Sequence, residues 1–293
     1  MKLIVDSGST KAEWRIQLSD QLFHSVQTVG INPVRDDENT VRRVVTAVAN
    51  GLVGDLSVAI GKTFSTRSVS SIFFYGAGCV SPYSDIVRRC LLEEFPKAKV
   101  RVESDLLGAA RALYGHSEGI ACIMGTGSNS CLYNGEKIVK NVSPLGWILG
   151  DEGSGAVLGR LFVGEVLKRQ FRRSLCVSFL QYHKLTPEDI IDHVYRQPQA
   201  NRFLASFVPY ISRVQDDREV RAFLLREFRR FFRRNVLVYK RPDLSVSFVG
   251  GVASAFEGLL REAAEREKLT FGFVEKSPIG KICDYHCSGE ALI

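Results

Sequence analysis

Two short glycine-rich segments, each set between two strand-like runs, constrain the fold of this chain more than any other feature. The first is DSGSTK at Asp6–Lys11, after the apolar run Leu3–Val5, and the second is MGTGSN at Met124–Asn129, after Gly119–Ile123. A strand that breaks into Gly, Ser and Thr and then returns as a strand forms a tight hairpin with exposed backbone N–H groups, which bind phosphate oxygens. Two such hairpins, about 120 residues apart, predict two similar halves that hold one polyphosphate from opposite sides.

The predicted elements around these hairpins repeat along the chain. Each hairpin belongs to a run of three strands, and the two runs are Lys2–Asp6, Glu13–Leu18 and Leu22–Val29, then Glu118–Met124, Ser130–Tyr133 and Lys137–Val142. Further strands are expected at Ser71–Tyr75 and Val100–Glu103 in the first half, and at Ser245–Val249 and Thr270–Val274 in the second. We interpret this order as an internal structural duplication, which needs no sequence identity between the halves.

Apolar residues at helical spacing predict the helices. In the first half these are Asp37–Leu52, Asp85–Phe95 and Leu106–Tyr114. The second half contains more helix, with segments near Ala156–Phe171, Pro187–Tyr195, Asn201–Ile211, Asp217–Tyr239 and Ala253–Glu267, and a closing helix over Ile279–Ile293. We expect the extra helices to shape either one wall of a substrate site or a homodimer contact.

Length, charge and cysteine content set the class of protein. A chain of 293 residues is long enough for two domains, each with its own core. The formal net charge of +7 suits an anionic substrate. Seven cysteines without a CxxC pair fit a reducing compartment. Because the sequence shows neither a signal-peptide pattern nor an apolar run long enough to span a bilayer, we expect a soluble cytoplasmic protein with no membrane partner.

The first hairpin combines a carboxylate with hydroxyl and backbone donors. Asp6 ends the first strand, and a carboxylate there assists phosphate binding only when Mg²⁺ lies between the two anions. The donors that follow are Ser7, Gly8, Ser9 and Thr10, with Lys11 as a further positive charge. An ordinary Asp-Ser-Gly turn is the alternative interpretation.

Two further glycine segments offer open backbone to a ligand. In Gly125–Gly127 the two glycines allow a ligand to approach the backbone closely, and the threonine between them adds a hydroxyl. The segment Phe248–Ser254 carries two glycines between a strand and a helix, where a nucleotide could lie without a side chain in its way. A hairpin turn and a tight strand-to-helix connection are the structural alternatives.

The segment GWILGDEGSG at Gly146–Gly155 is the most unusual part of the chain. It is too rich in glycine for a helix and too polar for a buried strand. Trp147 lies close to Asp151 and Glu152. An apolar ring beside carboxylates is typical of a carbohydrate contact, because the ring packs on C–H groups while the carboxylates accept hydrogen bonds from hydroxyls. A helix N-terminus capped by Asp151 or Ser154 is the alternative.

Taken together, the four segments resemble the N-acetylglucosamine kinase branch, which includes BadF/BadG/BcrA/BcrD-type ATPases, of the sugar kinase, heat-shock ATPase and actin superfamily. DSGSTK and GTGSN match the two phosphate loops of that family, FVGGVAS its adenosine motif, and GWILGDEGS its sugar-kinase signature. The resemblance spans essentially the whole chain. It implies an α/β fold of two ribonuclease H-like (actin-like ATPase) domains around a nucleotide cleft, 1–116 plus 280–293 and 117–279, with helical insertions in the second.

The resemblance also implies an ATP-dependent kinase for an amino sugar of the N-acetylglucosamine, glucosamine or N-acetylmuramic acid type, with ATP and Mg²⁺ as cofactors and without a nucleic-acid partner. The implied phosphate and nucleotide contacts are Ser7, Gly8, Ser9, Thr10, Lys11, Gly125, Thr126, Gly127, Gly250, Gly251 and Ser254. Asp6 would hold Mg²⁺ through water. The implied sugar contacts are Asn32, Asp105, Trp147 and Asp151.

Asp105 matches the catalytic aspartate of this family, at the tip of the predicted strand Val100–Glu103. In that role it accepts the proton of the sugar hydroxyl that attacks the γ-phosphate. Ser104 precedes it where asparagine is usual in the family. As the alternative, Asp105 caps the helix predicted over Leu106–Tyr114.

The sequence leaves two other functions open. An ATPase that activates a 2-hydroxyacyl-CoA dehydratase would hold an iron–sulfur cluster at a dimer interface, and Cys283 and Cys287 could share a helical face with His286 beside them. A nucleic-acid-binding regulator would use the arginines of one predicted helix, which are Arg218, Arg221, Arg226, Arg229, Arg230, Arg233 and Arg234. Such a pattern is more often a solvated basic face over a buried apolar stripe.

Overall fold

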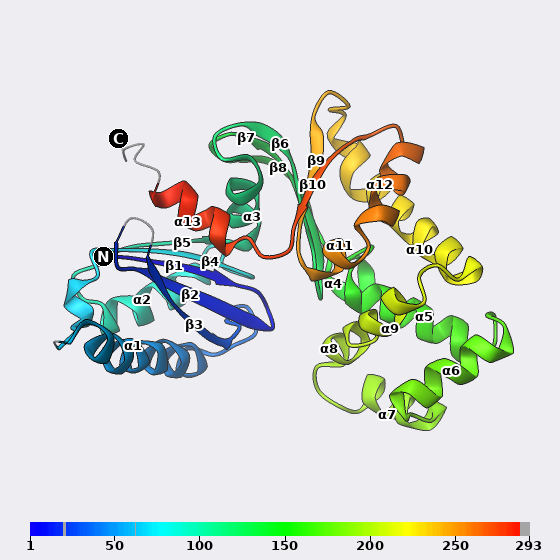
Figure 1. Cartoon of the computed structure of the whole chain (residues 1–293), viewed down its shortest axis with the longest axis horizontal. Helices are drawn as coiled ribbons and strands as arrows, with labels where there is room; N and C mark the ends of the chain where they lie inside the picture. The colour runs from blue at the N-terminus through cyan, green and yellow to red at the C-terminus, as the bar shows by residue number, and fades with distance from the viewer. Residues whose placement is uncertain (20–21, 62, 288–293) are drawn as a thin grey trace. The chain divides into compact units, whose positions relative to one another are not determined.

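The structure of the chain is a computed structural model that describes residues 1–19, 22–61 and 63–287. The chain forms two compact units. Unit 1 comprises residues 1–115 and the C-terminal segment from Pro278, and unit 2 comprises residues 116–277. Each unit contains one five-stranded sheet with helices beside it (Figure 1). Within the described ranges, no helix is both long and apolar enough to cross a membrane.

The sheet of unit 1 has the strand order β3-β2-β1-β4-β5. Its strands are β1 (Lys2–Ser7), β2 (Lys11–Gln17), β3 (Phe23–Val29), β4 (Ser71–Gly76) and β5 (Lys99–Ser104). The first three strands form an antiparallel meander, and β4 and β5 then run parallel to β1. The carboxyl ends of β1, β4 and β5 therefore lie at the same edge of this sheet.

Helices cover both faces of the unit 1 sheet. They are α1 (Glu38–Ile60), α2 (Ser84–Glu94), α3 (Asp105–Tyr114) and α13 (Ile279–Cys287), with a 3₁₀ turn at Thr66–Ser68. Side chains alternate between the faces of a strand, so Leu3 and Val5 join the core beside α1 and α2 while Ile4 joins the core beside α3 and α13. Burial on both faces explains why the first strand is a continuous apolar run.

Unit 2 repeats this sheet in the order β10-β9-β6-β7-β8. Its strands are β6 (Glu118–Met124), β7 (Ser128–Asn134), β8 (Ile138–Val142), β9 (Ser245–Val249) and β10 (Thr270–Glu275). Again a three-stranded antiparallel meander is followed by two strands parallel to its first member. The α/β fold with two equivalent halves is thus confirmed, and the additional helices belong to unit 2.

The helices of unit 2 surround a core rich in phenylalanine. They are α4 (Gly146–Leu149), α5 (Gly155–Leu167), α6 (Arg173–His183), α7 (Pro187–Tyr195), α8 (Ala200–Ala205), α9 (Val208–Arg213), α10 (Arg218–Phe231), α11 (Gly251–Ala255) and α12 (Glu257–Arg266). A π-helical turn at Phe232–Val236 and a 3₁₀ turn at Leu237–Tyr239 follow α10. As the sequence predicts, an apolar stripe of α10 that includes Val220, Leu224, Phe228 and Phe231 is buried.

Several helix predictions were wrong in extent. The segment Asn201–Ile211 contains two short helices, because Pro209 stands in the first turn of α9 and has no N–H to continue the preceding helix. Helix α6 was not predicted, and its buried stripe holds only three residues, Leu175, Cys176 and Phe179. Gly146–Leu149 forms a single helical turn despite its glycine. The closing helix is described as far as Cys287, and the rest of that prediction lies outside the described residues.

Candidate active site

The predicted site residues fall into two groups, one in each unit. Unit 1 carries Asp6, the loop from Ser7 to Lys11, Asn32 and Asp105. Unit 2 carries the remaining predicted positions, which are Gly125, Thr126, Gly127, Trp147, Asp151, Gly250, Gly251 and Ser254. Each group is described within its own unit.

The first glycine-rich loop connects β1 to β2 at the carboxyl end of the unit 1 sheet. Ser7 is buried, and its Oγ accepts a hydrogen bond from the Ile31 N–H at 2.9 Å and donates one to the Ile31 carbonyl at 3.2 Å. That hydroxyl is therefore used by the fold, although the sequence suggested it as a ligand donor. Thr10 and Lys11 are exposed at the far side of the loop, where a ligand can reach them.

Gly30 supports this loop and was missed as a functional position. A Cβ added to Gly30 would lie 2.0 Å from the Gly8 carbonyl oxygen and 2.9 Å from the Lys11 nitrogen. The Gly30 N–H also donates a hydrogen bond to the Thr10 carbonyl at 3.1 Å. Only glycine allows this approach, so Gly30 holds the first loop in its shape. Its place two residues before Asn32 was the available signal.

Asn32 lies against the same loop rather than standing free. Its Nδ2 donates to Ser9 Oγ at 3.4 Å, and its Oδ1 accepts from the Val34 N–H at 3.2 Å. Gly78, with a φ of 74°, provides the space, because a Cβ there would lie 2.3 Å from Asn32 Oδ1. The structure thus brings Asn32 and the first loop together, as two predicted site elements of unit 1.

Two acidic residues lie near the carboxyl edge of the unit 1 sheet. In the register of the parallel strands, Ser7 of β1 pairs with Gly76 of β4, and Gly76 pairs with Ser104 of β5. Asp6 precedes the first residue of this row and Asp105 follows the last. The strands β1 and β5 are two strand spacings apart, which corresponds to about 10 Å. Gly76 of β4, which lies between them, has no side chain to fill the space between the two acidic residues.

Burial disfavours the charged form of both carboxyl groups, and the charge of Asp105 adds to this at Asp6. Burial raises the pKa of Asp6 to about 7, and the negative charges of Asp105 and Glu13 raise it further, while Lys11 opposes them. Burial raises the pKa of Asp105 to about 6. Glu13 faces Asp6 across the β1–β2 pair and was not singled out from the sequence. An acidic group that ionises near neutral pH at the edge of a sheet can exchange a proton with a substrate.

Asp105 does not cap the helix that follows it, so the capping interpretation was wrong. Ser104 is the N-cap of α3, and its Oγ accepts the Leu107 N–H at 3.2 Å. Asp105 is the first residue of α3, and its Oδ1 accepts the Leu106 N–H at 2.9 Å. Because serine performs the capping, the aspartate is held by the helix N-terminus without being needed to start it.

In unit 2 the second and third glycine segments touch. Gly250 has a φ of 128°, and a Cβ on it would lie 2.4 Å from the Met124 carbonyl oxygen and 3.3 Å from the Gly125 nitrogen. Gly125 and Gly251 face open space, since a Cβ added to either would meet no atom within 4 Å. Sequence reasoning paired these segments by function, and the structure shows that they form one open backbone surface at the carboxyl ends of β6 and β9.

The loop before α5 wraps around the second glycine hairpin. The Gly155 and Ala156 N–H groups donate to the Gly125 and Thr126 carbonyls at 2.8 and 3.1 Å. Ser154 caps α5 through the Val157 N–H. Asp151 has a φ of 49°, and a Cβ on Gly127 would come within 3.2 Å of its carboxylate.

Asp151 is thereby fixed beside the hairpin. Burial raises its pKa to about 6, a backbone hydrogen bond from Ser128 lowers it, and the charge of Glu152 raises it. Trp147 is half-buried and packs against the unit 2 core, so only part of its ring is free for a ligand. The predicted aromatic ring and carboxylate thus lie on one loop. The carboxylate of Asp151 is held there by its contacts with the second glycine hairpin.

A buried polar network holds this loop, and sequence reasoning missed it. Glu152 is buried and binds Arg234 at 2.8 Å and Asn235 Nδ2 at 3.1 Å. The Ser128 hydroxyl donates to the Glu152 carbonyl at 2.8 Å, and the Ser130 hydroxyl donates to the Asn235 carbonyl at 2.8 Å. The π-helical turn after α10 places these two partners of Glu152, and such turns are frequent at functional sites.

The residues proposed for an iron–sulfur cluster have a structural role instead. Cys283 is buried in the core between α13 and the unit 1 sheet, and burial raises the pKa of its thiol to about 12. His286 stacks on Phe73 with ring centroids 3.7 Å apart and shares a hydrogen bond of 2.8 Å with the Tyr75 hydroxyl. These contacts attach α13 to unit 1. The Cys283 thiol is enclosed by this packing.

Among the residues that the structure describes, no cluster of three or more His, Cys, Asp or Glu side chains is arranged to hold a metal ion. Mg²⁺ often keeps several waters and binds through one or two carboxylates together with substrate phosphates. The negative charges of Asp105 and Glu13 near Asp6 favour a cation beside Asp6. The donor set therefore fits Mg²⁺ held mainly by water and phosphate, with Asp6 as the protein group.

Comparison with solved structures finds one relative of high sequence identity and others that share the fold. Over 99% of both chains, the protein is 45% identical, with a TM-score of 0.89, to a Porphyromonas gingivalis protein provisionally described as an N-acetylglucosamine kinase. A Chromobacterium violaceum protein with the same provisional description is 20% identical over 97% of this chain and 98% of that one, with a TM-score of 0.71. A ROK family glucokinase from Streptomyces griseus, solved with glucose and AMPPNP, shares the fold at 16% identity over 97% of each chain and a TM-score of 0.54. No protein-family model and no curated protein matches the sequence.

Proposed function

Since the chain belongs to the N-acetylglucosamine kinase family of sugar kinases with the actin-like ATPase fold, we propose that it phosphorylates an amino sugar with ATP and uses Asp105 as the general base. The observation that carries this proposal is the pair Asp6 and Asp105 at the carboxyl edge of the unit 1 sheet. We assign the two carboxyl groups separate roles, with Asp6 beside a cation and Asp105 beside the incoming hydroxyl.

Asp105 is suited to accept a proton at neutral pH. With a pKa of about 6, it is mostly ionised at pH 7 and remains basic enough to take a hydroxyl proton as that hydroxyl loses it. The sugar oxygen forms a bond to the γ-phosphorus while the bond from that phosphorus to the leaving oxygen of ADP breaks. The hydroxyl proton goes to Asp105. Phosphoryl transfer needs little more from the protein than positioning and charge neutralisation.

The glycine segments are proposed to hold the nucleotide. Support comes from the open backbone at Gly125 and Gly251, from the Thr126 hydroxyl, and from the exposed positions of Ser254 and Lys11. When bound, Mg²⁺ at Asp6 would neutralise phosphate charge. The amino sugar is proposed to meet Asn32, Trp147 and Asp151, of which Asp151 is the most firmly placed.

The test is an ATP-consumption screen over N-acetylglucosamine, glucosamine and N-acetylmuramic acid. Removal of a general base lowers the rate by about 10²–10⁴-fold, so Asp105→Asn should lose turnover by that factor while ATP binding persists. Asp85→Asn changes an exposed carboxylate in the first turn of α2 and serves as the matched control. A near-normal rate in the Asp105 variant would remove that residue from the role.

A further inference from the structure

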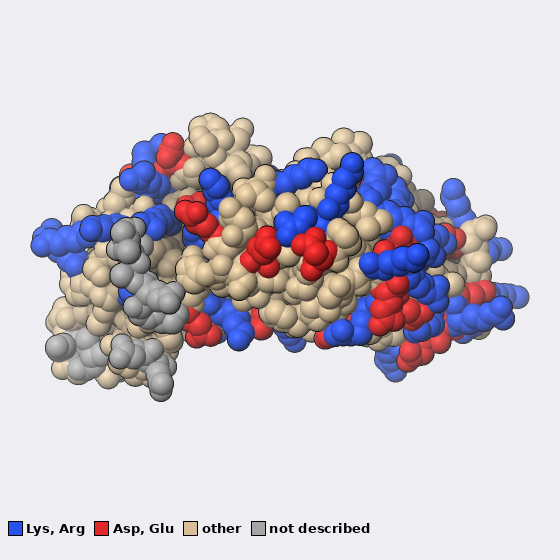
Figure 2. All heavy atoms as spheres, turned by 90° about the horizontal axis from the view of Figure 1, so that it is seen from above, with Lys and Arg blue, Asp and Glu red and all other residues tan. Residues whose placement is uncertain are grey.

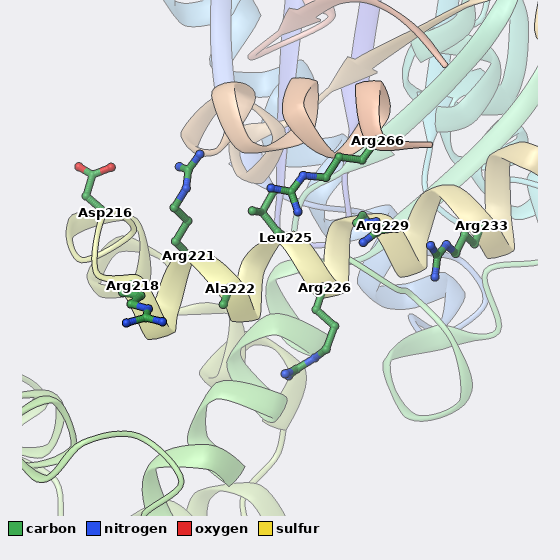
Figure 3. Close-up of a pocket in the computed structure, with 9 residues that line it drawn as sticks. All are labelled: Asp216, Arg218, Arg221, Ala222, Leu225, Arg226, Arg229, Arg233 and Arg266. Carbon is green, nitrogen blue, oxygen red and sulfur yellow. The ribbon is translucent and has the colours of Figure 1, made fainter. Parts of the chain in front are cut away.

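Unit 2 contains a second group of charged side chains, on α10, the turn after it and α12. Basic residues, with acidic ones among them, gather over the region of unit 2 that carries α10 and α12 (Figures 1 and 2). There, a cavity of about 540 Å³ is lined by Asp216, Arg218, Arg221, Ala222, Leu225, Arg226, Arg229, Arg233 and Arg266. Figure 3 shows Arg266 reaching from α12 toward α10. We name this cavity the arginine pocket.

Six arginines line the arginine pocket, against Asp216 in the lining and four carboxylates that pair with these arginines, those of Glu165, Glu227, Glu262 and Glu267. Glu262 pairs with both Arg221 and Arg266, the latter at 2.7 Å. Glu267 pairs with both Arg229, at 2.6 Å, and Arg233, at 2.9 Å. Each of these two carboxylates offers about four acceptor positions to two guanidinium groups with about ten N–H donors between them. Donors are therefore left over for an anion in the cavity.

Arg218 adds a charge that has no ion-pair partner among the described residues. It is the first residue of α10, where the helix dipole opposes a cation while the neighbouring Asp217 and Glu219 favour one. It is exposed, and it forms no ion pair with any residue in the described ranges. Its guanidinium donors are therefore open to an anion in the pocket.

We propose that the arginine pocket binds a small anion with two or more phosphate groups. Guanidinium groups bind phosphate oxygens in a two-pronged manner and keep their charge at every physiological pH. A cavity of this size falls in the range of small-molecule sites. It is concave and lined from two helices, whereas a duplex nucleic acid needs an extended basic surface, so a compact oligophosphate is the better match.

The arginine pocket is connected to the candidate active site of the same unit. Arg233 lines the pocket, and the next two residues, Arg234 and Asn235, bind Glu152 in the loop that carries Asp151. An anion that draws Arg233 away from Glu267 acts on the π-helical turn directly. An anion bound in the arginine pocket is thus placed to influence the loop that carries Asp151. Whether the anion binds can be tested without any assay of kinase activity.

The experiment is calorimetric titration of the full chain with inorganic tripolyphosphate in a chelating buffer without Mg²⁺ or sugar. The pocket variant is Arg218→Gln with Arg233→Gln, in which Glu267 keeps Arg229 as its partner. The control is Arg230→Gln with Arg261→Gln, which removes the same amount of charge from α10 and α12 but outside the lining. Loss of charge-assisted contacts should weaken binding about tenfold or more in the pocket variant and less than about twofold in the control.

Each outcome decides the proposal. Binding that weakens in the pocket variant only, and that also weakens as salt is added, supports it. Equal weakening in both variants would mean a diffuse charge effect and would overturn it. Unchanged affinity in the pocket variant would place the anion elsewhere, and no binding at all would leave the arginines as an ion-pair network. A short DNA duplex that binds where tripolyphosphate does not would replace the proposal with nucleic-acid recognition.

Discussion

Replacement of Asp6 by asparagine should make the protein more stable at alkaline pH, although we place Asp6 in the catalytic machinery. The charged form of Asp6 is disfavoured by burial and by Asp105 and Glu13. Below pH 4 the folded and unfolded chains both hold the Asp6 proton. Between about pH 4 and 7 only the folded chain keeps it, so the free energy of unfolding falls as pH rises. Above about pH 7 that loss is complete.

The size of the effect follows from the pKa. The pKa of Asp6 rises from 3.8 to about 7 on folding, a difference of about 3 pKa units. At about 1.4 kcal/mol per pKa unit, this lowers the free energy of unfolding at alkaline pH by about 4 kcal/mol. Because Asp6 is only half-buried and water screens part of the repulsion, we expect Asp6→Asn to gain about 2–4 kcal/mol at pH 8. At about 2–4 °C per kcal/mol, the melting temperature should rise by on the order of 10 °C.

The assay is thermal unfolding of wild type and Asp6→Asn from pH 4 to pH 8 with a chelator, which keeps divalent cations from neutralising the carboxylate. The gain should be largest at pH 8 and should vanish near pH 4. Asp85→Asn, at an exposed carboxylate, should show no such trend. A variant that is no more stable than wild type at pH 8, or a gain that persists unchanged at pH 4, would refute the electrostatic reasoning.

Three further predictions concern both units. The rate of sugar phosphorylation should fall about tenfold per pH unit below about pH 6, as Asp105 takes up its proton; a flat kcat/KM profile from pH 5 to 8 would contradict this. Gly250→Ala should lower the free energy of unfolding by about 2 kcal/mol or more and weaken nucleotide binding, because its Cβ would lie 2.4 Å from the Met124 carbonyl oxygen at a φ of 128°. Gly251→Ala places its Cβ in open space and should change the free energy of unfolding by less than about 1 kcal/mol. Urea unfolding of the two variants compares these effects. Glu152→Gln should lower the free energy of unfolding by about 1–3 kcal/mol, since the amide nitrogen that replaces one carboxylate oxygen cannot accept from Arg234 or from the buried Asn235 amide. An unchanged urea midpoint would show that the network is not needed.

Much of the fold could be predicted because its determinants are local. Continuous apolar runs such as Leu3–Val5 specify strands buried on both faces, and a run of glycine and hydroxyl residues specifies the hairpin that follows. The ends of the helices were harder to predict from the sequence. A proline in the first turn of α9 and the π-helical turn after α10 divide segments that read as single helices, since apolar spacing continues across a break in the hydrogen bonding.

By itself, the sequence determined the duplicated α/β architecture, the glycine segments and the acidic residue at the end of β5, because each of these depends on neighbours along the chain. Tertiary structure alone decided which side chains those features meet. The pKa of Asp6 depends on a strand two places away, the glycine of the third segment on a carbonyl about 125 residues earlier, and the loop of Asp151 on a turn about 80 residues later. Electrostatic and steric contacts depend on distance in space, and the order of strands in a sheet, rather than the order of residues in the chain, sets that distance.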